Sequence, residues 1–122
     1  MEPSASILIV DDHAGFRAFA KAMLEAAGFT VAEAATGAQA TEAARMVRPN
    51  LVLLDIQLPD IDGFEVARRL AADDEGPIVV LTSTREASDY GGRITASSAA
   101  AFLPKDQLSG PALRQFLRSC HQ

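Results

Sequence analysis

Carboxylate side chains follow two of the apolar runs in this sequence. The run Ile7–Val10 is followed by Asp11 and Asp12, and the run Leu51–Leu54 is followed by Asp55. Continuous apolar runs of this kind fit parallel strands that are covered on both faces. Because parallel strands end at the same edge of a sheet, these carboxylates are expected to meet in one crevice. Carboxylates this close raise each other's pKa or require a cation.

A hydroxyl and an amine are predicted at the same edge. Thr82 follows an apolar run at 78–81, and Lys105 follows another at 100–103. Taken singly, a strand-end Asp is usually a turn former, a Thr a helix cap and a Lys a solvated charge. Their combination at four strand ends instead favours a site for a metal ion and a phosphate group.

The donor atoms of this site indicate which metal it would take. Asp11, Asp12 and Asp55 offer only oxygen, which selects a hard cation. Mg2+ fits best, because it accepts one or two carboxylates together with water and a phosphate oxygen. His13 follows the acidic pair, but a solvated histidine at the start of a helix is the commoner interpretation.

Alternating strands and helices must position these residues. Apolar runs and turn signals predict five strands, at 7–10, 29–34, 51–54, 78–81 and 100–103. Repeated units of a strand followed by a helix give a parallel sheet with helices on both faces. Glycine costs a helix about 1 kcal/mol relative to alanine, so Gly91 and Gly92 predict a short, broken or mobile helix within 84–99.

Caps and apolar stripes predict the remaining helices. Thr36 is the expected N-cap of the second helix, with Gln39 as its capping-box partner, and Ser109 caps the last helix ahead of Pro111. The inner face of the second helix is predicted to be Ala40, Ala43, Ala44 and Val47. The buried stripe of the last helix is predicted to be Leu113, Phe116, Leu117 and Cys120.

Composition excludes several classes of protein. The 122 residues carry 11 Lys and Arg against 16 Asp and Glu, a net charge of −5, which argues against direct nucleic-acid binding by this chain. No apolar run approaches the roughly 18 residues that span a membrane, and no signal peptide is recognisable. The lone Cys120 suits the reducing cytoplasm. With no linker or repeat, residues 1–122 are expected to form a single domain.

The whole pattern resembles the receiver (CheY-like) domain of bacterial two-component response regulators. The segments that carry the resemblance are Ile7–Asp12, Leu51–Asp60 with Asp62-Gly63, Pro77–Ser83 and Ala101–Lys105. The resemblance implies a flavodoxin-like three-layer α/β/α sandwich whose five-stranded parallel sheet has the order 2-1-3-4-5.

The resemblance also implies a role for each residue of the site. Asp55 matches the phosphoacceptor. Asp12 matches the direct Mg2+ ligand, joined by Asp55 and the backbone carbonyl of Gln57, while Asp11 matches the position that holds the ion through water. The resemblance further implies that the chain is a phosphoacceptor that assists its own phosphorylation and dephosphorylation, and that it is not a stand-alone kinase.

Three further positions match the family's switch. Thr82 matches the hydroxyl that bonds a phosphoryl oxygen, and Lys105 matches the cation that pairs with another. Phe102 matches the aromatic position that turns inward when Thr82 is drawn to the phosphate. The implied output is a changed surface at the fourth helix, fifth strand and fifth helix. The implied partners are a sensor histidine kinase or phosphotransfer protein and a downstream effector, and homodimer formation on phosphorylation is left open.

Other functions remain as alternatives. The chain fits a receiver fragment of a longer DNA-binding regulator. A Mg2+-dependent small-molecule phosphatase could use Asp55 as nucleophile, but haloacid dehalogenase-type enzymes have a second Asp where this chain has Gln57. A flavin or dinucleotide binder would need a glycine-rich loop after the first strand, which is lacking. A degenerate, partner-binding receiver would have lost an acidic or lysine position, and none is lost.

Overall fold

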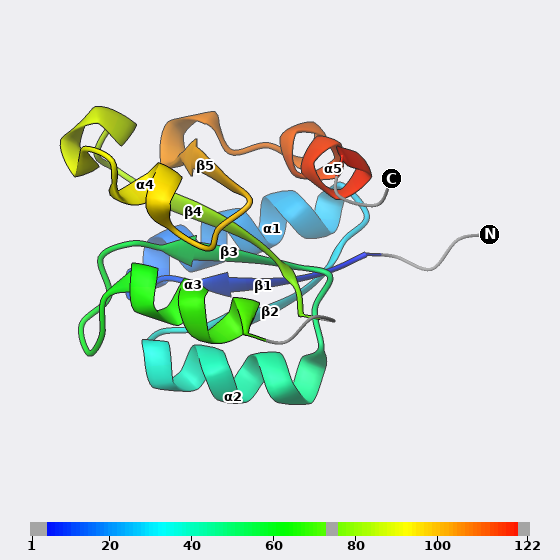
Figure 1. The fold of residues 1–122 in the computed structure, drawn as a ribbon. Helices are drawn as coiled ribbons and strands as arrows, with labels where there is room; N and C mark the ends of the chain where they lie inside the picture. The colour runs from blue at the N-terminus through cyan, green and yellow to red at the C-terminus, as the bar shows by residue number, and fades with distance from the viewer. Residues whose placement is uncertain (1–4, 73–75, 120–122) are drawn as a thin grey trace.

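The computed structural model describes residues 5–72 and 76–119. Its five strands form one parallel sheet in the order β2-β1-β3-β4-β5, which confirms the flavodoxin-like arrangement and strand order expected from the sequence (Figure 1). The strands are β1 (Ser6–Val10), β2 (Thr30–Ala34), β3 (Leu51–Asp55), β4 (Ile78–Ser83) and β5 (Ala101–Pro104). The α-helices are α1 (Ala14–Ala26), α2 (Gly37–Val47), α3 (Gly63–Ala71), α4 (Arg93–Ala96) and α5 (Gly110–Ser119).

The sheet separates two apolar cores. Helices α1 and α5 cover one face, and α2 and α3 cover the other (Figure 1). Side chains alternate along each strand, so Ile7 and Ile9 of β1 enter the first core while Leu8 and Val10 enter the second. All four are fully buried, as the continuous apolar run predicts for a strand covered on both faces.

The predicted start of α2 is confirmed in part. Thr36 Oγ1 accepts a hydrogen bond from the Gln39 N–H at 3.1 Å, as an N-cap does. The Gln39 side chain is wrongly predicted as a capping-box partner, because it reaches past Thr36 and accepts from the Ala35 N–H at 2.8 Å. The prediction that Val47 lies on the inner face is also wrong. It is 44% exposed, because the helix ends there and the chain turns away through Arg48 in the left-handed region.

The segment between β4 and β5 is short and broken, as its glycines predict. It consists of the 3₁₀ turn η1 (Ala87–Tyr90) and the single turn of α4, separated by Gly91 at φ 59°. Glycine adopts this left-handed backbone without steric cost.

The last helix follows its predicted signals. Ser109 Oγ accepts from the Ala112 N–H at 3.1 Å, so the expected cap forms. Leu113 and Leu117 are buried beneath α5, and Phe116 packs partly buried against the same core. Cys120, the last member of the predicted stripe, lies outside the described residues.

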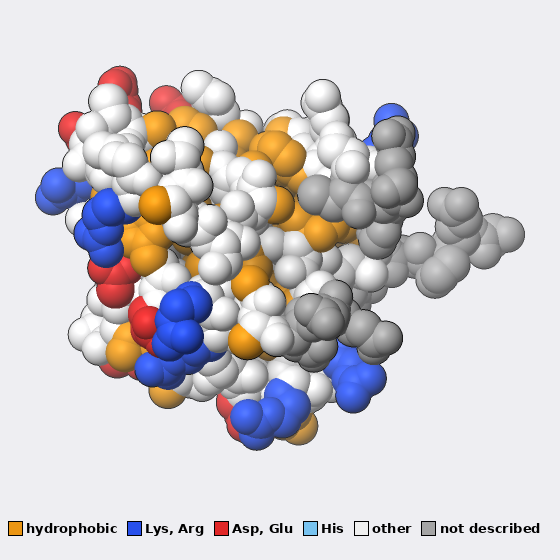
Figure 2. Space-filling view, viewed as in Figure 1, with side chains coloured by type: hydrophobic (Ala, Val, Ile, Leu, Met, Phe, Trp, Pro, Cys, Tyr) orange, Lys and Arg blue, Asp and Glu red, His pale blue; other side chains and the backbone are white. Residues whose placement is uncertain are grey.

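The visible surface is mixed in charge. On the face shown in Figure 2, basic side chains stand in separate groups, several of them beside acidic ones. The surface ion pairs of the described residues include Arg45–Glu42 and Arg68–Glu65. Among the residues that the structure describes, no helix is long and apolar enough to cross a membrane.

Candidate functional site

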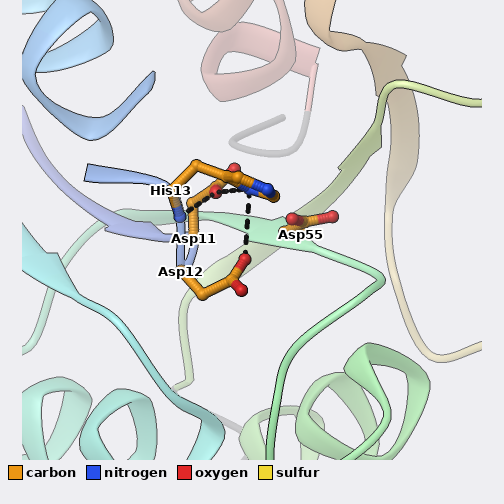
Figure 3. A group of neighbouring side chains, drawn as sticks. All are labelled: Asp11, Asp12, His13 and Asp55. Carbon is orange, nitrogen blue, oxygen red and sulfur yellow. Dashed lines mark hydrogen bonds and ion pairs between the residues drawn. The ribbon is translucent and has the colours of Figure 1, made fainter. Parts of the chain in front are cut away.

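Three carboxylates meet at the carboxyl edge of the sheet, as the sequence predicts. Asp11 and Asp12 follow β1, and Asp55 is the last residue of β3 (Figure 3). One ligand atom from each of these residues and from His13 lies within 4.8 Å of all the others. Asp11 and Asp55 are buried, whereas the Asp12 side chain is 36% exposed. The site therefore has a buried part, the floor, formed by Asp11 and Asp55, and a solvent-exposed rim at Asp12.

Lys105 brings positive charge to this floor. Its Nζ lies 2.5 Å from Asp11 Oδ2 and 3.4 Å from Asp55 Oδ2, and its side chain is only 10% exposed. The ammonium also lies 4.5 Å from the centre of the Phe16 ring, which fits a cation–π contact. One ammonium thus faces two buried carboxylates, and a third carboxylate stands beside them.

The environment of Asp55 makes its charged form costly. Burial raises the pKa of Asp55 above its ordinary value of 3.8, and the nearby charge of Asp11 raises it further. The Gln57 N–H, which donates to Asp55 Oδ1 at 3.1 Å, and the Lys105 ammonium act in the opposite direction but do not cancel the effect of burial on this pKa. Asp55 is therefore a carboxylate that gains from a nearby cation.

Thr82 lies beside Asp55 and carries a buried hydroxyl. The two residues are partners in the pairing of β3 with β4. Thr82 is buried, and its Oγ1 has no hydrogen-bond partner among the described residues. A buried hydroxyl without a partner is costly, so a new acceptor on Asp55 would find a donor already in place.

Phe102 lies on β5, next to the strand that carries Thr82. It is partly buried, and its ring centre lies 6.4 Å from that of Tyr90. The Tyr90 ring also meets Phe64 edge-on at 6.0 Å, and its hydroxyl is 2.6 Å from Ser83 Oγ. The sequence interpretation singled out Phe102 but missed Tyr90 and Ser83, because no local pattern pairs them.

Two more residues organise the acidic pair. His13 Nδ1 lies 3.0 Å from Asp11 Oδ1 and 3.1 Å from Asp12 Oδ1, with 69% of its side chain exposed. Arg17, one turn further along α1, donates from Nη1 to the Asp11 carbonyl at 2.8 Å. Sequence reasoning did not single out Arg17. Its position in the first turns of α1, six residues after Asp11, could have indicated it.

The donor set fits a divalent cation. Asp11, Asp12 and Asp55 supply three carboxylates against the single ammonium of Lys105, so negative charge is in excess. Asp11 Oδ2 is buried, and its polar contact among the described residues is the ion pair with that ammonium. The exposed side of Asp12 leaves room for the waters that Mg2+ retains.

Comparison with known proteins gives one consistent result. The family model of the response regulator receiver domain matches residues 7–118. The chain is 43% identical over 83 residues to the DNA-binding response regulator MtrA of Mycobacterium tuberculosis H37Rv, covering 68% of this chain and 36% of that protein. It is 39% identical over 84 residues to the transcriptional regulatory protein AfsQ1 of Streptomyces coelicolor, covering 69% of this chain and 37% of that protein.

A solved structure extends the similarity to nearly the whole chain. The signal receiver domain of the response regulator NarL from Mycobacterium tuberculosis superposes with a TM-score of 0.86 at 27% identity. The superposition covers 96% of this chain and 98% of that domain. The chain thus spans little more than a third of MtrA and AfsQ1, yet almost all of an isolated receiver domain.

Proposed function

The chain belongs to the receiver domain family of two-component response regulators, and we propose that it is a signalling switch phosphorylated on Asp55. The observation that carries the proposal is the convergence of three groups at one sheet edge. Asp55 is a buried carboxylate of raised pKa, Lys105 is the ammonium 3.4 Å from it, and Thr82 carries a buried hydroxyl that bonds to none of the described residues. Together they form an acceptor for a phosphoryl group and two partners for its oxygens.

Each residue has a distinct part in the transfer. An Asp55 carboxylate oxygen forms a bond to phosphorus while the P–N bond of a kinase phosphohistidine breaks; the electron pair leaves with the imidazole nitrogen, which takes up a proton. Lys105 pairs with one phosphoryl oxygen, and its position beside both buried carboxylates keeps it there. Asp11, Asp12, Asp55 and the Gln57 carbonyl would hold Mg2+, which when bound supplies positive charge beside the phosphoryl oxygens.

Phosphorylation adds nearly two negative charges at the end of β3, and the response begins at Thr82. Its hydroxyl, which has no partner among the residues that the structure describes, turns to donate to a phosphoryl oxygen, and Phe102 fills the space that this movement opens. Because Phe102 contacts Tyr90, the shift reaches the segment that contains η1 and α4. The result is a population shift between two surfaces built from α4, β5 and α5.

The wider assignments are also proposals. We place residues 1–122 in one receiver domain that works in the cytoplasm, takes its phosphoryl group from a histidine kinase or phosphotransfer protein, and acts on an effector. It is a phosphoacceptor rather than a stand-alone enzyme. A second proposal is that it is the receiver part of a longer regulator, which is favoured by the greater length of MtrA and AfsQ1.

Intact-mass spectrometry tests the phosphoacceptor directly. Incubation with acetyl phosphate and Mg2+ should add one phosphoryl group to the wild type and none to Asp55→Asn. Asp106→Asn is the matched control, because Asp106 is an exposed carboxylate directly after Lys105, and it should be labelled like the wild type. Equal labelling of Asp55→Asn and the wild type would reject the assignment.

A further inference from the structure

The loop that joins β3 to α3 is attached to the start of a neighbouring helix, α2. Asp60, in this loop, accepts from the Gly37 N–H through Oδ1 at 2.8 Å and from the Ala38 N–H through Oδ2 at 3.0 Å. Gly37 and Ala38 are the first residues of α2, where backbone N–H groups have no partner within the helix. A carboxylate is favoured here by both hydrogen bonding and the helix dipole. The Gly37 and Ala38 hydrogen bonds lower the pKa of Asp60, so they favour its charged form.

Close packing reinforces this attachment. A side chain on Gly37 would collide with Ile61, so the start of α2 lies directly against the loop. At the far end of the loop, Gly63 donates its N–H to the Ile56 carbonyl at 2.9 Å. A Cβ on Gly63 would lie 2.5 Å from the Asp55 carbonyl oxygen, so the loop also folds tightly back onto β3.

Gln57 lies between these fixed points. Its N–H is bonded to Asp55 Oδ1, and its carbonyl belongs to the backbone that Asp60 holds three residues later. Another polar contact of the loop is the Arg93–Asp62 ion pair at 2.7 Å. Both of those side chains are exposed, and exposed ion pairs contribute little to fixing a backbone. Asp60 is exposed as well, but both of its carboxylate oxygens accept from backbone N–H groups of a helix rather than from a flexible side chain. It is therefore the stronger polar restraint on the middle of the loop.

We propose that Asp60 is a positioning residue for the metal site, which it serves by fixing the loop that presents the Gln57 carbonyl. This inference rests on the proposed function, since it assumes that the carboxylate cluster binds Mg2+. Asp60 touches neither the ion nor the phosphoryl group. It acts by holding a ligand's backbone against α2, as residues behind a metal ligand commonly do.

The competing explanation is that Asp60 only stabilises the start of α2. The chain offers a matched control, because Thr36 caps the same helix end from its own segment, through the Gln39 N–H. Thr36→Ala should lower the stability of the protein, as removal of an N-cap usually does. It removes a cap from α2 but leaves the bonds of Asp60 in place.

Calorimetric titration with MgCl2 separates the two roles. Asp60→Ala should bind Mg2+ about tenfold more weakly than the wild type, the lower end of the effect expected for residues behind a ligand. Thr36→Ala should keep the wild-type affinity. Asp60→Asn should fall between, since an amide keeps one acceptor oxygen, and it decides the question if the alanine variant does not fold. Wild-type affinity in the folded Asp60 variants would overturn the inference.

Amide hydrogen exchange supplies a readout without metal. The Gln57 amide should exchange faster in metal-free Asp60→Ala than in the wild type, and Thr36→Ala should leave it unchanged. If the wild type binds no Mg2+, the proposed function loses its cofactor, while the exchange rates still decide whether Asp60 fixes the loop. Equal rates in all three proteins would reject that part of the inference.

Discussion

Replacing Lys105 by Met tests the electrostatic balance of the site most directly. The substitution removes the ammonium, which lies 2.5 Å from Asp11 Oδ2 and 3.4 Å from Asp55 Oδ2. Methionine keeps an unbranched stem, so the main change is the loss of the charge, and with it the cation–π contact to Phe16. In metal-free protein, two buried carboxylates then remain without a cation.

The magnitude follows from distance and burial. At an effective dielectric constant of about 20, opposite charges 3.4 Å apart attract by about 5 kcal/mol. Desolvation of the ammonium offsets part of this, yet removing one partner of a buried pair typically costs about 3–5 kcal/mol, because the other partner stays buried. Water at the exposed rim near Asp12 reduces the penalty, so we expect a loss of about 3 kcal/mol in the free energy of unfolding.

Urea unfolding at pH 7.5, followed by circular dichroism, measures this loss with EDTA and again with MgCl2. Mg2+ should stabilise Lys105→Met more than it stabilises the wild type, because the variant has more uncompensated negative charge at the site. Removing the metal should therefore expose the full penalty, and adding it should recover part of the lost stability.

A surface lysine provides the control. Lys21 is 3.6 Å from Glu33 in an exposed pair, so Lys21→Met should change the free energy of unfolding by less than about 1 kcal/mol, with a wild-type response to Mg2+. The reasoning is refuted if Lys105→Met is no less stable than Lys21→Met in EDTA. It is also refuted if Mg2+ stabilises Lys105→Met by no more than it stabilises the wild type.

Two further predictions concern Asp55 and Tyr90. Because burial raises the pKa of Asp55 above 3.8, its contribution to stability is fully present below that pH and is lost as the pH rises through the folded-state pKa. Metal-free Asp55→Asn should therefore be more stable than the wild type at pH 7 and gain nothing at pH 3, and urea unfolding that showed the same difference at both pH values would contradict this. In a double-mutant cycle, Tyr90→Phe and Ser83→Ala should show a coupling of about 1 kcal/mol from their shared hydrogen bond, measured by urea unfolding. Strictly additive losses would show that this bond contributes nothing.

The sequence was sufficient to predict where most of the site lies. Asp11 and Asp55 end apolar runs, and Thr82 and Lys105 follow two more, so parallel strands alone place all four at one edge. The strand order was accessible only through the resemblance to receiver domains, because alternation of strands and helices is compatible with several orders.

Contacts between loops could not be predicted in this way. Asp60 and Gly37 are 23 residues apart and meet only because the β3–α3 loop folds back toward α2. Tyr90 and Ser83 meet because η1 turns the chain back over the end of β4. The prediction that Val47 is on the inner face was wrong for a related reason. Helical periodicity indicates which residues share a face, but it does not indicate where the neighbouring element ends.

The alternation of side chains along β1 limits how the sequence of this strand can evolve. Ile7 and Ile9 of β1 enter one core, Leu8 and Val10 enter the other, and Asp11 directly follows the strand. Deleting one residue from β1 would turn the side chains beyond the deletion toward the opposite face of the sheet. It would displace Asp11 and Asp12 at the same time. This strand can therefore vary by substitution, while gains and losses of residues are tolerated only in the connections beside it.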